Sequence, residues 1–161
     1  MDLKLELIVL PVSDVDRAKA FYQAVGFQLD VDNTVSGDYR VVHFTPPGSE
    51  CSIIFGTGMT SAAPGSVQGL YLVVFDIEEA RAELVGRGID VGEVFHDAGW
   101  ALHHGHDAGG VVHPGAGQER VAGPHPARAD YASYLTFSDP DGNGWVLQEV
   151  KRRIRPPLTS R

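Results

Sequence analysis

The fold is decided by a stretch of sequence that occurs twice. Residues 10–29 read LPVSDVDRAKAFYQAVGFQL, and residues 72–91, 62 positions later, read LVVFDIEEARAELVGRGIDV. The copies share an aspartate, an alanine pair and a glycine in one register: Asp14 with Asp76, Ala18 with Ala80, Ala20 with Ala82 and Gly26 with Gly88. Self-similarity at a fixed offset indicates a repeated structural unit. The sequence therefore predicts two tandem modules of the same fold.

Each copy predicts the same order of elements. An apolar run at residues 5–12 or 70–75 predicts a strand. An aspartate that can cap a helix, followed by apolar residues at helical spacing, predicts helices over residues 15–25 and 77–87, each ended by glycine. Further strands are expected at 27–31, 39–45 and 52–55 in the first copy and at 89–95, 133–138 and 144–150 in the second. Each copy is thus β-α-β-β-β, and the fold class is α+β.

Composition between and after the copies predicts the domain boundaries. We expect a first module at residues 1–57, a Gly-, Ser-, Ala- and Pro-containing linker at 58–67, and a second module at 68–150. The second module contains a glycine-rich stretch at 97–130 without periodicity, which predicts a long loop. Residues 151–161 form a basic tail.

Charge and cysteine content exclude several classes of function. The 161 residues include 21 acidic and 13 basic side chains, for a formal charge of −8. Such a balance argues against nucleic acid and against an anionic membrane as partner. The single cysteine, Cys51, excludes an intrachain disulfide and zinc sites of several cysteines. With no long apolar run and no signal-peptide pattern at the N-terminus, we expect a soluble cytoplasmic protein.

Two phrases carry a resemblance to a known family. Residues 10–22, followed by Gly26-Phe27, and the later phrase FSDPDGN at residues 137–143 resemble the vicinal oxygen chelate superfamily. This superfamily includes glyoxalase I, bleomycin-resistance proteins, fosfomycin-resistance enzymes and extradiol dioxygenases. The resemblance covers residues 3–150. It implies paired βαβββ modules whose sheets curl into a cup, in a protein that forms a homodimer.

The resemblance also implies where a metal would lie. Metal-dependent members hold one divalent ion through His, Gln or Glu on the first strand of each module and Glu on a late strand. The matching positions here are Leu7, Gly69 and Val146, and residues 52–55 contain no carboxylate. None of these side chains can donate a lone pair to a metal. Only a shifted alignment would bring in Glu6, Gln68 or Glu149. No cofactor is predicted, and a divalent metal is the alternative.

Strand alternation then predicts what lines the cup. If Leu7 faces inward, every second residue of each inner strand does so too. With a tryptophan added as an aromatic wall, the expected ligand-binding residues are Leu7, Val9, Tyr71, Trp100, Val146 and Gln148. This mostly apolar set suits a small organic molecule oriented by a few polar groups. The first hypothesis is therefore a ligand-binding protein of the bleomycin-resistance kind, without the usual metal.

The histidines support an alternative. Six of the seven lie at positions 96, 103, 104, 106, 113 and 125. Histidine is both the commonest metal ligand and a natural proton carrier at neutral pH. The alternative is an enzyme of the superfamily, a lyase, isomerase or dioxygenase. It would use His96 or His103 in catalysis, or His103, His104 and His106 as a relocated metal site. The seventh, His43, either faces the cup or bonds nearby backbone.

Overall fold

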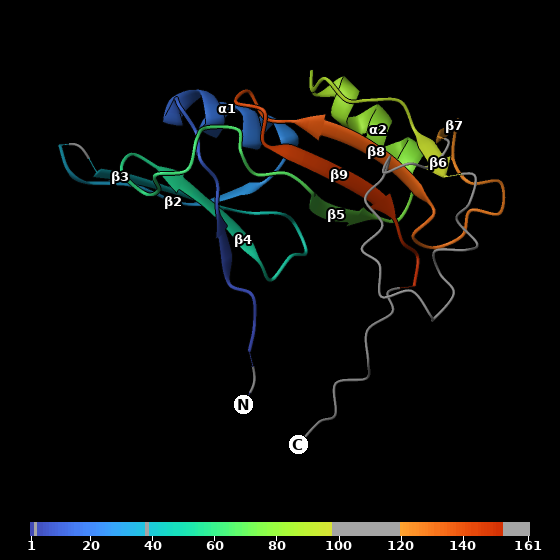
Figure 1. Ribbon diagram of the computed structural model, residues 1–161, viewed down its shortest axis with the longest axis horizontal. Coiled ribbons are helices and arrows are strands. Elements are labelled where there is room, and N and C mark those ends of the chain that lie inside the picture. Colours follow the sequence, from blue (N-terminus) through green and yellow to red (C-terminus); the bar gives the residue numbers. More distant parts are fainter. Residues whose placement is uncertain (2, 38, 98–119, 153–161) are drawn as a thin grey trace. The chain divides into compact units, whose positions relative to one another are not determined.

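A computed structural model describes residues 1, 3–37, 39–97 and 120–152 of the chain (Figure 1). The chain forms two compact units. One comprises Met1–Leu70, Leu84–Asp90 and Phe137–Trp145, and the other comprises Tyr71–Glu83, Val91–Thr136 and Val146–Arg161. Within the described ranges, no helix combines the length and the apolarity needed to cross a bilayer.

The predicted order of a strand, a helix and further strands occurs twice along the chain, with one extra strand in the second run. The first consists of β1 (Leu7–Val9), α1 (Val15–Val25), β2 (Gln28–Ser36), β3 (Tyr39–Thr45) and β4 (Ser52–Gly56). The second consists of β5 (Leu70–Val74), α2 (Ile77–Gly86), β6 (Phe95–Asp97), β7 (Arg120–Ala122), β8 (Ser133–Ser138) and β9 (Gly144–Glu149). Their sheets have the orders β1-β4-β3-β2 and β5-β9-β8-β6-β7. The second order repeats the first with β7 added at one edge, which confirms the α+β fold of two like modules.

The shared residues of the repeat have the expected local roles. Asp14 Oδ1 accepts a hydrogen bond from the Arg17 amide at 2.9 Å, at the start of α1. Asp76 Oδ1 accepts from the amides of Glu78 and Glu79 at the start of α2. Gly26 and Gly88 follow the two helices with φ of +103° and +80°, in the left-handed region that glycine tolerates best. The same caps therefore delimit both helices.

Aromatic rings form the core beneath α1. Tyr22 is fully buried, and its ring lies 5.5 Å from that of Phe27, 5.6 Å from Phe55 and 6.0 Å from Trp145, between centroids. The ring of Phe44 stacks on that of Phe55 at 5.9 Å. These contacts establish which face of the four-stranded sheet is turned toward α1.

Several predicted element boundaries were wrong, among them those of the first strand, which was expected at 5–12 and spans Leu7–Val9. The strand expected at 89–95 is reduced to an isolated bridge at Val91, and β6 begins only at Phe95. The carbonyl of Gly92 accepts from Arg81 Nε at 3.0 Å instead of from a strand on that side. β2 continues to Ser36, well past residue 31, because polar residues of its second half pair with β3 and Asp32 binds Arg40. Within the expected loop, Arg120–Ala122 forms β7, which is too short to show periodicity.

Candidate functional site

The positions that would hold the family's metal carry no donor side chain. Leu7 lies in β1 and Val146 in β9. Gly69, with φ of +75°, immediately precedes β5. Aliphatic side chains and a glycine cannot coordinate a divalent ion through side-chain atoms. These three residues therefore do not fit the ion.

The buried carboxylate that a shifted alignment could supply is used within the fold. Glu149 is fully buried and accepts from the Ile77 amide at 3.0 Å, at the start of α2. Arg128 binds the same carboxylate through Nε at 3.0 Å and Nη2 at 2.5 Å. Burial alone would raise the pKa of Glu149, but the hydrogen bonds from Arg128 and the Ile77 amide outweigh burial and lower it. Glu149 is thus an ionised structural group.

The other two residues that a shifted alignment could supply, Gln68 and Glu6, are no better placed to bind a metal. Gln68 Nε2 donates to the carbonyls of Gly142 at 2.8 Å and Gly65 at 3.1 Å. Glu6 is exposed and precedes β1. Among the residues that the structure describes, no three or more His, Cys, Asp or Glu side chains are grouped as a metal would require. The described part of the chain therefore does not fit the family's usual metal site.

Leu7 and Val9 lie on the sheet face opposite to α1. Phe44 and Phe55 pack beneath that helix with Tyr22, so alternate residues point the other way. Val9 of β1 pairs with Ile54 of β4, and Ile54 pairs with His43 of β3, so all three share the Leu7 face. Leu7, Val9, Ile54 and His43 are all half-buried. This face, defined by Leu7, Val9, Ile54 and His43, is called the Leu7 face below.

His43 is the polar member of the Leu7 face. Its Nε2 atom is buried and has no hydrogen-bond partner among the described residues. Of the two sequence-based alternatives for His43, the structure places it on the face of Leu7, with Nε2 unbonded to backbone. Its neighbours Leu7, Val9 and Ile54 are aliphatic, while Thr45 and Ser52, which share the face by alternation, bond to each other through their hydroxyls. The Leu7 face therefore combines apolar surface with one unpaired polar atom.

Val146 belongs to an apolar cluster in the second unit. It packs with Phe95 and Tyr134, whose rings lie 5.7 Å apart between centroids. Gln148, two residues along β9, donates through Nε2 to the Tyr131 carbonyl at 3.3 Å, and the Tyr134 hydroxyl donates to the same oxygen. Val146 and Gln148 therefore share a face with aromatic neighbours. The Nε2 atom of Gln148 therefore makes a hydrogen bond within the fold.

Of the remaining predicted residues, Tyr71 and His96 lie in described strands. Tyr71 lies in β5 and is 38% exposed. Trp100, His103, His104 and His106 lie outside the described residues. His96 alternates with Phe95 along β6, so its side chain faces away from the cluster of Val146.

His96 instead pairs with a histidine that the sequence did not single out. Its Nδ1 lies 2.9 Å from the Gly123 carbonyl and must donate, because a carbonyl only accepts. The ring of His125 lies edge-on to it at 5.6 Å between centroids. Burial, and then the neighbouring His96, lower the pKa of His125. This arrangement favours a neutral ring at His125.

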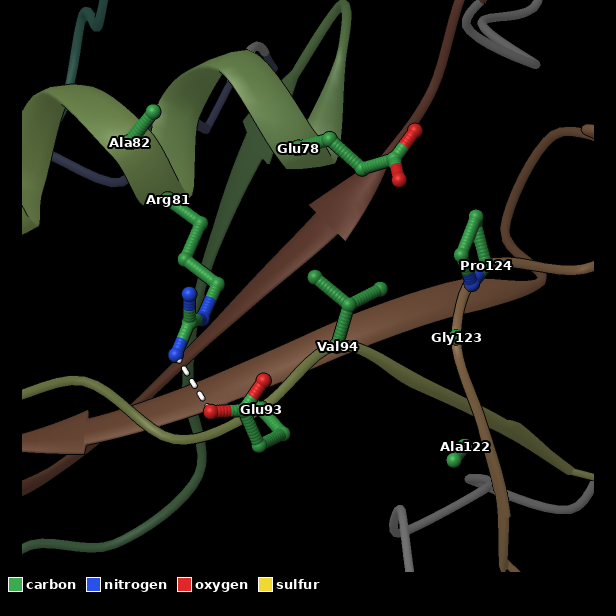
Figure 2. Close-up of a pocket in the computed structure, with 8 residues that line it drawn as sticks. All are labelled: Glu78, Arg81, Ala82, Glu93, Val94, Ala122, Gly123 and Pro124. Atoms are coloured by element: carbon green, nitrogen blue, oxygen red, sulfur yellow. Dashed lines mark hydrogen bonds and ion pairs between the residues drawn. The ribbon is translucent and has the colours of Figure 1, made fainter.

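A hollow of about 320 Å³ lies beside α2. Figure 2 shows Arg81 extending from α2 to Glu93, while Ala122, Gly123 and Pro124 lie along another wall. Arg81 and Glu93 are bound to each other at 2.5 Å. The lining comes from three segments that are distant in sequence, so no local motif predicts it. The salt bridge makes it a poor match for an apolar ligand.

Comparison with solved structures identifies similar proteins. TnmS3, an antibiotic binding protein from Streptomyces sp. CB03234, is 27% identical with a TM-score of 0.63, covering 92% of this chain and 97% of TnmS3. A glyoxalase/bleomycin resistance protein from the same organism is 27% identical with a TM-score of 0.61, covering 91% of this chain and 100% of the other. A superfamily member from Sphaerobacter thermophilus DSM 20745 is 25% identical with a TM-score of 0.62, covering 92% and 98%.

The family itself is established by sequence. None of the curated proteins compared with this chain matches it. The sequence model of the Glyoxalase/Bleomycin resistance protein/Dioxygenase superfamily, however, matches residues 4–147. This range begins before β1 and ends within β9, so it includes both motifs of the repeat. The chain therefore belongs to the glyoxalase/bleomycin resistance/dioxygenase superfamily.

Proposed function

We propose that this protein binds a small, largely apolar organic molecule without converting it and without the divalent ion of its metal-dependent relatives. One observation carries the proposal: Leu7, Gly69 and Val146 stand at the positions where the family resemblance implies metal ligands. A Lewis-acid reaction needs an ion with open coordination positions. The residues here offer aliphatic surface instead, so binding is the function they support best.

The apolar residues of each unit support an organic ligand. In the first unit, Leu7, Val9 and Ile54 form a half-buried aliphatic surface. In the second, Val146 lies with Phe95 and Tyr134. Ligand sites are commonly apolar with a few convergent polar groups. The similarity to an antibiotic binding protein from Streptomyces favours a ligand of antibiotic size and chemistry.

Metal dependence and turnover provide the decisive test. The purified full chain, stripped with EDTA, is titrated by calorimetry with metal-free bleomycin, tetracycline and novobiocin. The same titrations are repeated after adding zinc, manganese, nickel or ferrous ion. We expect at least one compound to bind with micromolar or tighter affinity, unchanged by metal, and to be recovered intact by mass spectrometry.

Two results would overturn the proposal. One is binding that appears only when a stoichiometric metal is restored. The other is chemical conversion of a bound compound, which would favour the lyase, isomerase or dioxygenase alternative. The homodimer and the cytoplasmic location stay predictions, and light scattering coupled to gel filtration would test the first.

A further inference from the structure

We infer that His43 is the residue that orients the ligand on the Leu7 face, and that the ligand therefore carries a hydroxyl group within a mainly apolar framework. The inference rests on the proposed function and adds to it a specificity-determining residue and a ligand class. It concerns binding only.

The position of His43 makes it central to this face. It lies in β3 (Tyr39–Thr45) and pairs with Ile54 of β4, which in turn pairs with Val9 of β1. The flanking residues Val42 and Phe44 are fully buried toward α1. The imidazole thus points away from the aromatic core, onto the half-buried surface that contains Leu7.

The unbonded Nε2 atom requires an explanation. A buried polar atom without a partner costs about 1–3 kcal/mol relative to a paired one. Most such groups in folded proteins are satisfied, so an exception indicates an absent ligand or a water. Among the described residues, Nε2 of His43 has no protein partner. Leucine would suit the alternating pattern of β3 here and leave no polar atom unpaired.

The hydrogen-bonding capacity of the imidazole indicates which polar group the ligand carries. In a neutral ring, Nε2 donates in one tautomer and accepts in the other. A hydroxyl can meet either tautomer, because it both donates and accepts. The aliphatic neighbours Leu7, Val9 and Ile54 favour hydrocarbon around that hydroxyl. A phenol or a similar hydroxylated ring system combines these properties.

A matched pair of probes tests this assignment. Naphthalene and 2-naphthol differ by one hydroxyl and are titrated into the full-length wild type and into His43→Leu. We expect the wild type to bind 2-naphthol about 3- to 10-fold more tightly, which is the contribution of one net hydrogen bond. His43→Leu should bind the two equally, with naphthalene affinity kept. His43→Gln should restore part of the preference, and Leu3→Ala, at an exposed residue outside the sheet, should leave it unchanged.

Thermal unfolding separates a binding role from a structural one. If Nε2 is unpaired in the free protein, His43→Leu should melt at the same temperature or a few degrees higher. A melting temperature several degrees lower would show that His43 stabilises the fold, and would overturn the inference. Equal binding of both probes by the wild type would overturn the inference while leaving the proposed function standing. Binding of neither probe would overturn the inference, while the antibiotic titrations decide the proposed function.

Discussion

The hydroxyl of Tyr22 donates a hydrogen bond to Oδ2 of Asp139 at 2.9 Å, although the two residues are 117 positions apart. Trp145 Nε1 donates to the same hydroxyl at 3.2 Å. Asp139 Oδ1 accepts from the amides of Asp141, Gly142 and Asn143, which close the turn between β8 and β9. The phenol of α1 is therefore bound to the turn between β8 and β9 inside one compact unit.

Removing this hydroxyl should destabilise the protein. In Tyr22→Phe, Asp139 loses a donor and Trp145 loses an acceptor in a fully buried setting, so we expect a loss of about 1–3 kcal/mol in the free energy of unfolding. Urea denaturation followed by circular dichroism would measure it. Tyr39→Phe is the control, because Tyr39 is 40% exposed.

The same contact has a pH signature. Burial first, and then the charge of Asp139, raise the pKa of Tyr22 above the ordinary value of about 10. A raised pKa stabilises the fold fully below the ordinary value and loses this effect as pH rises through the folded-state value. The deficit of Tyr22→Phe should therefore be constant between pH 6 and 9. A deficit that vanished within that range would contradict the assignment.

The sequence motifs were recognisable, but their mutual contact was not. Local rules predicted both caps and the turn, because a cap depends on residues within a few positions of itself. They could not predict that Asn143 Nδ2 donates to the Pro11 carbonyl at 3.0 Å, or that Asp141 binds Ser13. These bonds depend on how distant segments meet. Both motifs of the family resemblance thus share one hydrogen-bonded junction.

That junction distinguishes two salt bridges that look alike in sequence. Asp141 has a side chain 5% exposed, accepts from the amide of Ser13 at 3.1 Å and pairs with Arg17 at 3.0 Å. Asp16 pairs with Arg40 at 2.7 Å but is 82% exposed. We expect Asp141→Ala to cost about 1–2 kcal/mol and Asp16→Ala less than about 0.5 kcal/mol. Urea denaturation in 0.15 M salt would measure both, and equal costs would refute the distinction.

Glu149 should make stability depend on acid pH. Hydrogen bonds from Arg128 and the Ile77 amide lower its pKa below the ordinary value of about 4.3. A lowered pKa stabilises the fold above the ordinary value, and this contribution disappears as pH falls through the folded-state value. Glu149→Gln should cost about 2–4 kcal/mol at pH 7, because Arg128 loses its buried partner.

The pH profile of this variant provides the check. Wild-type stability should fall between about pH 5 and pH 3, and Glu149→Gln should show a shallower fall over that range. Glu50→Gln, at an exposed glutamate, should follow the wild type. Parallel profiles for Glu149→Gln and the wild type would show that Glu149 does not titrate as proposed.

The candidate site was predictable in part, for a physical reason. Alternation along a strand determines which side chains share a face, and the sequence shows it directly. It does not show what those side chains bond. Gln148 was expected at the ligand, yet its amide donates to the Tyr131 carbonyl. The His96–His125 pair was missed because Arg120–Ala122 pairs with β6, and a three-residue strand leaves no sequence pattern.

Truncating an apolar side chain of the Leu7 face should weaken ligand binding more than it lowers the stability of the fold. Ile54 is half-buried between paired strands, so Ile54→Ala removes apolar surface from the face while Ile53 and Phe55 keep the core beneath α1. Truncating an apolar contact in a pocket costs about 1–3 kcal/mol of binding, so we expect 2-naphthol affinity to fall about 5- to 100-fold. Leu3→Ala is the control, since Leu3 is 82% exposed and lies outside the sheet. If calorimetry gave the same affinity for Ile54→Ala and Leu3→Ala, the ligand would contact some other surface of the protein.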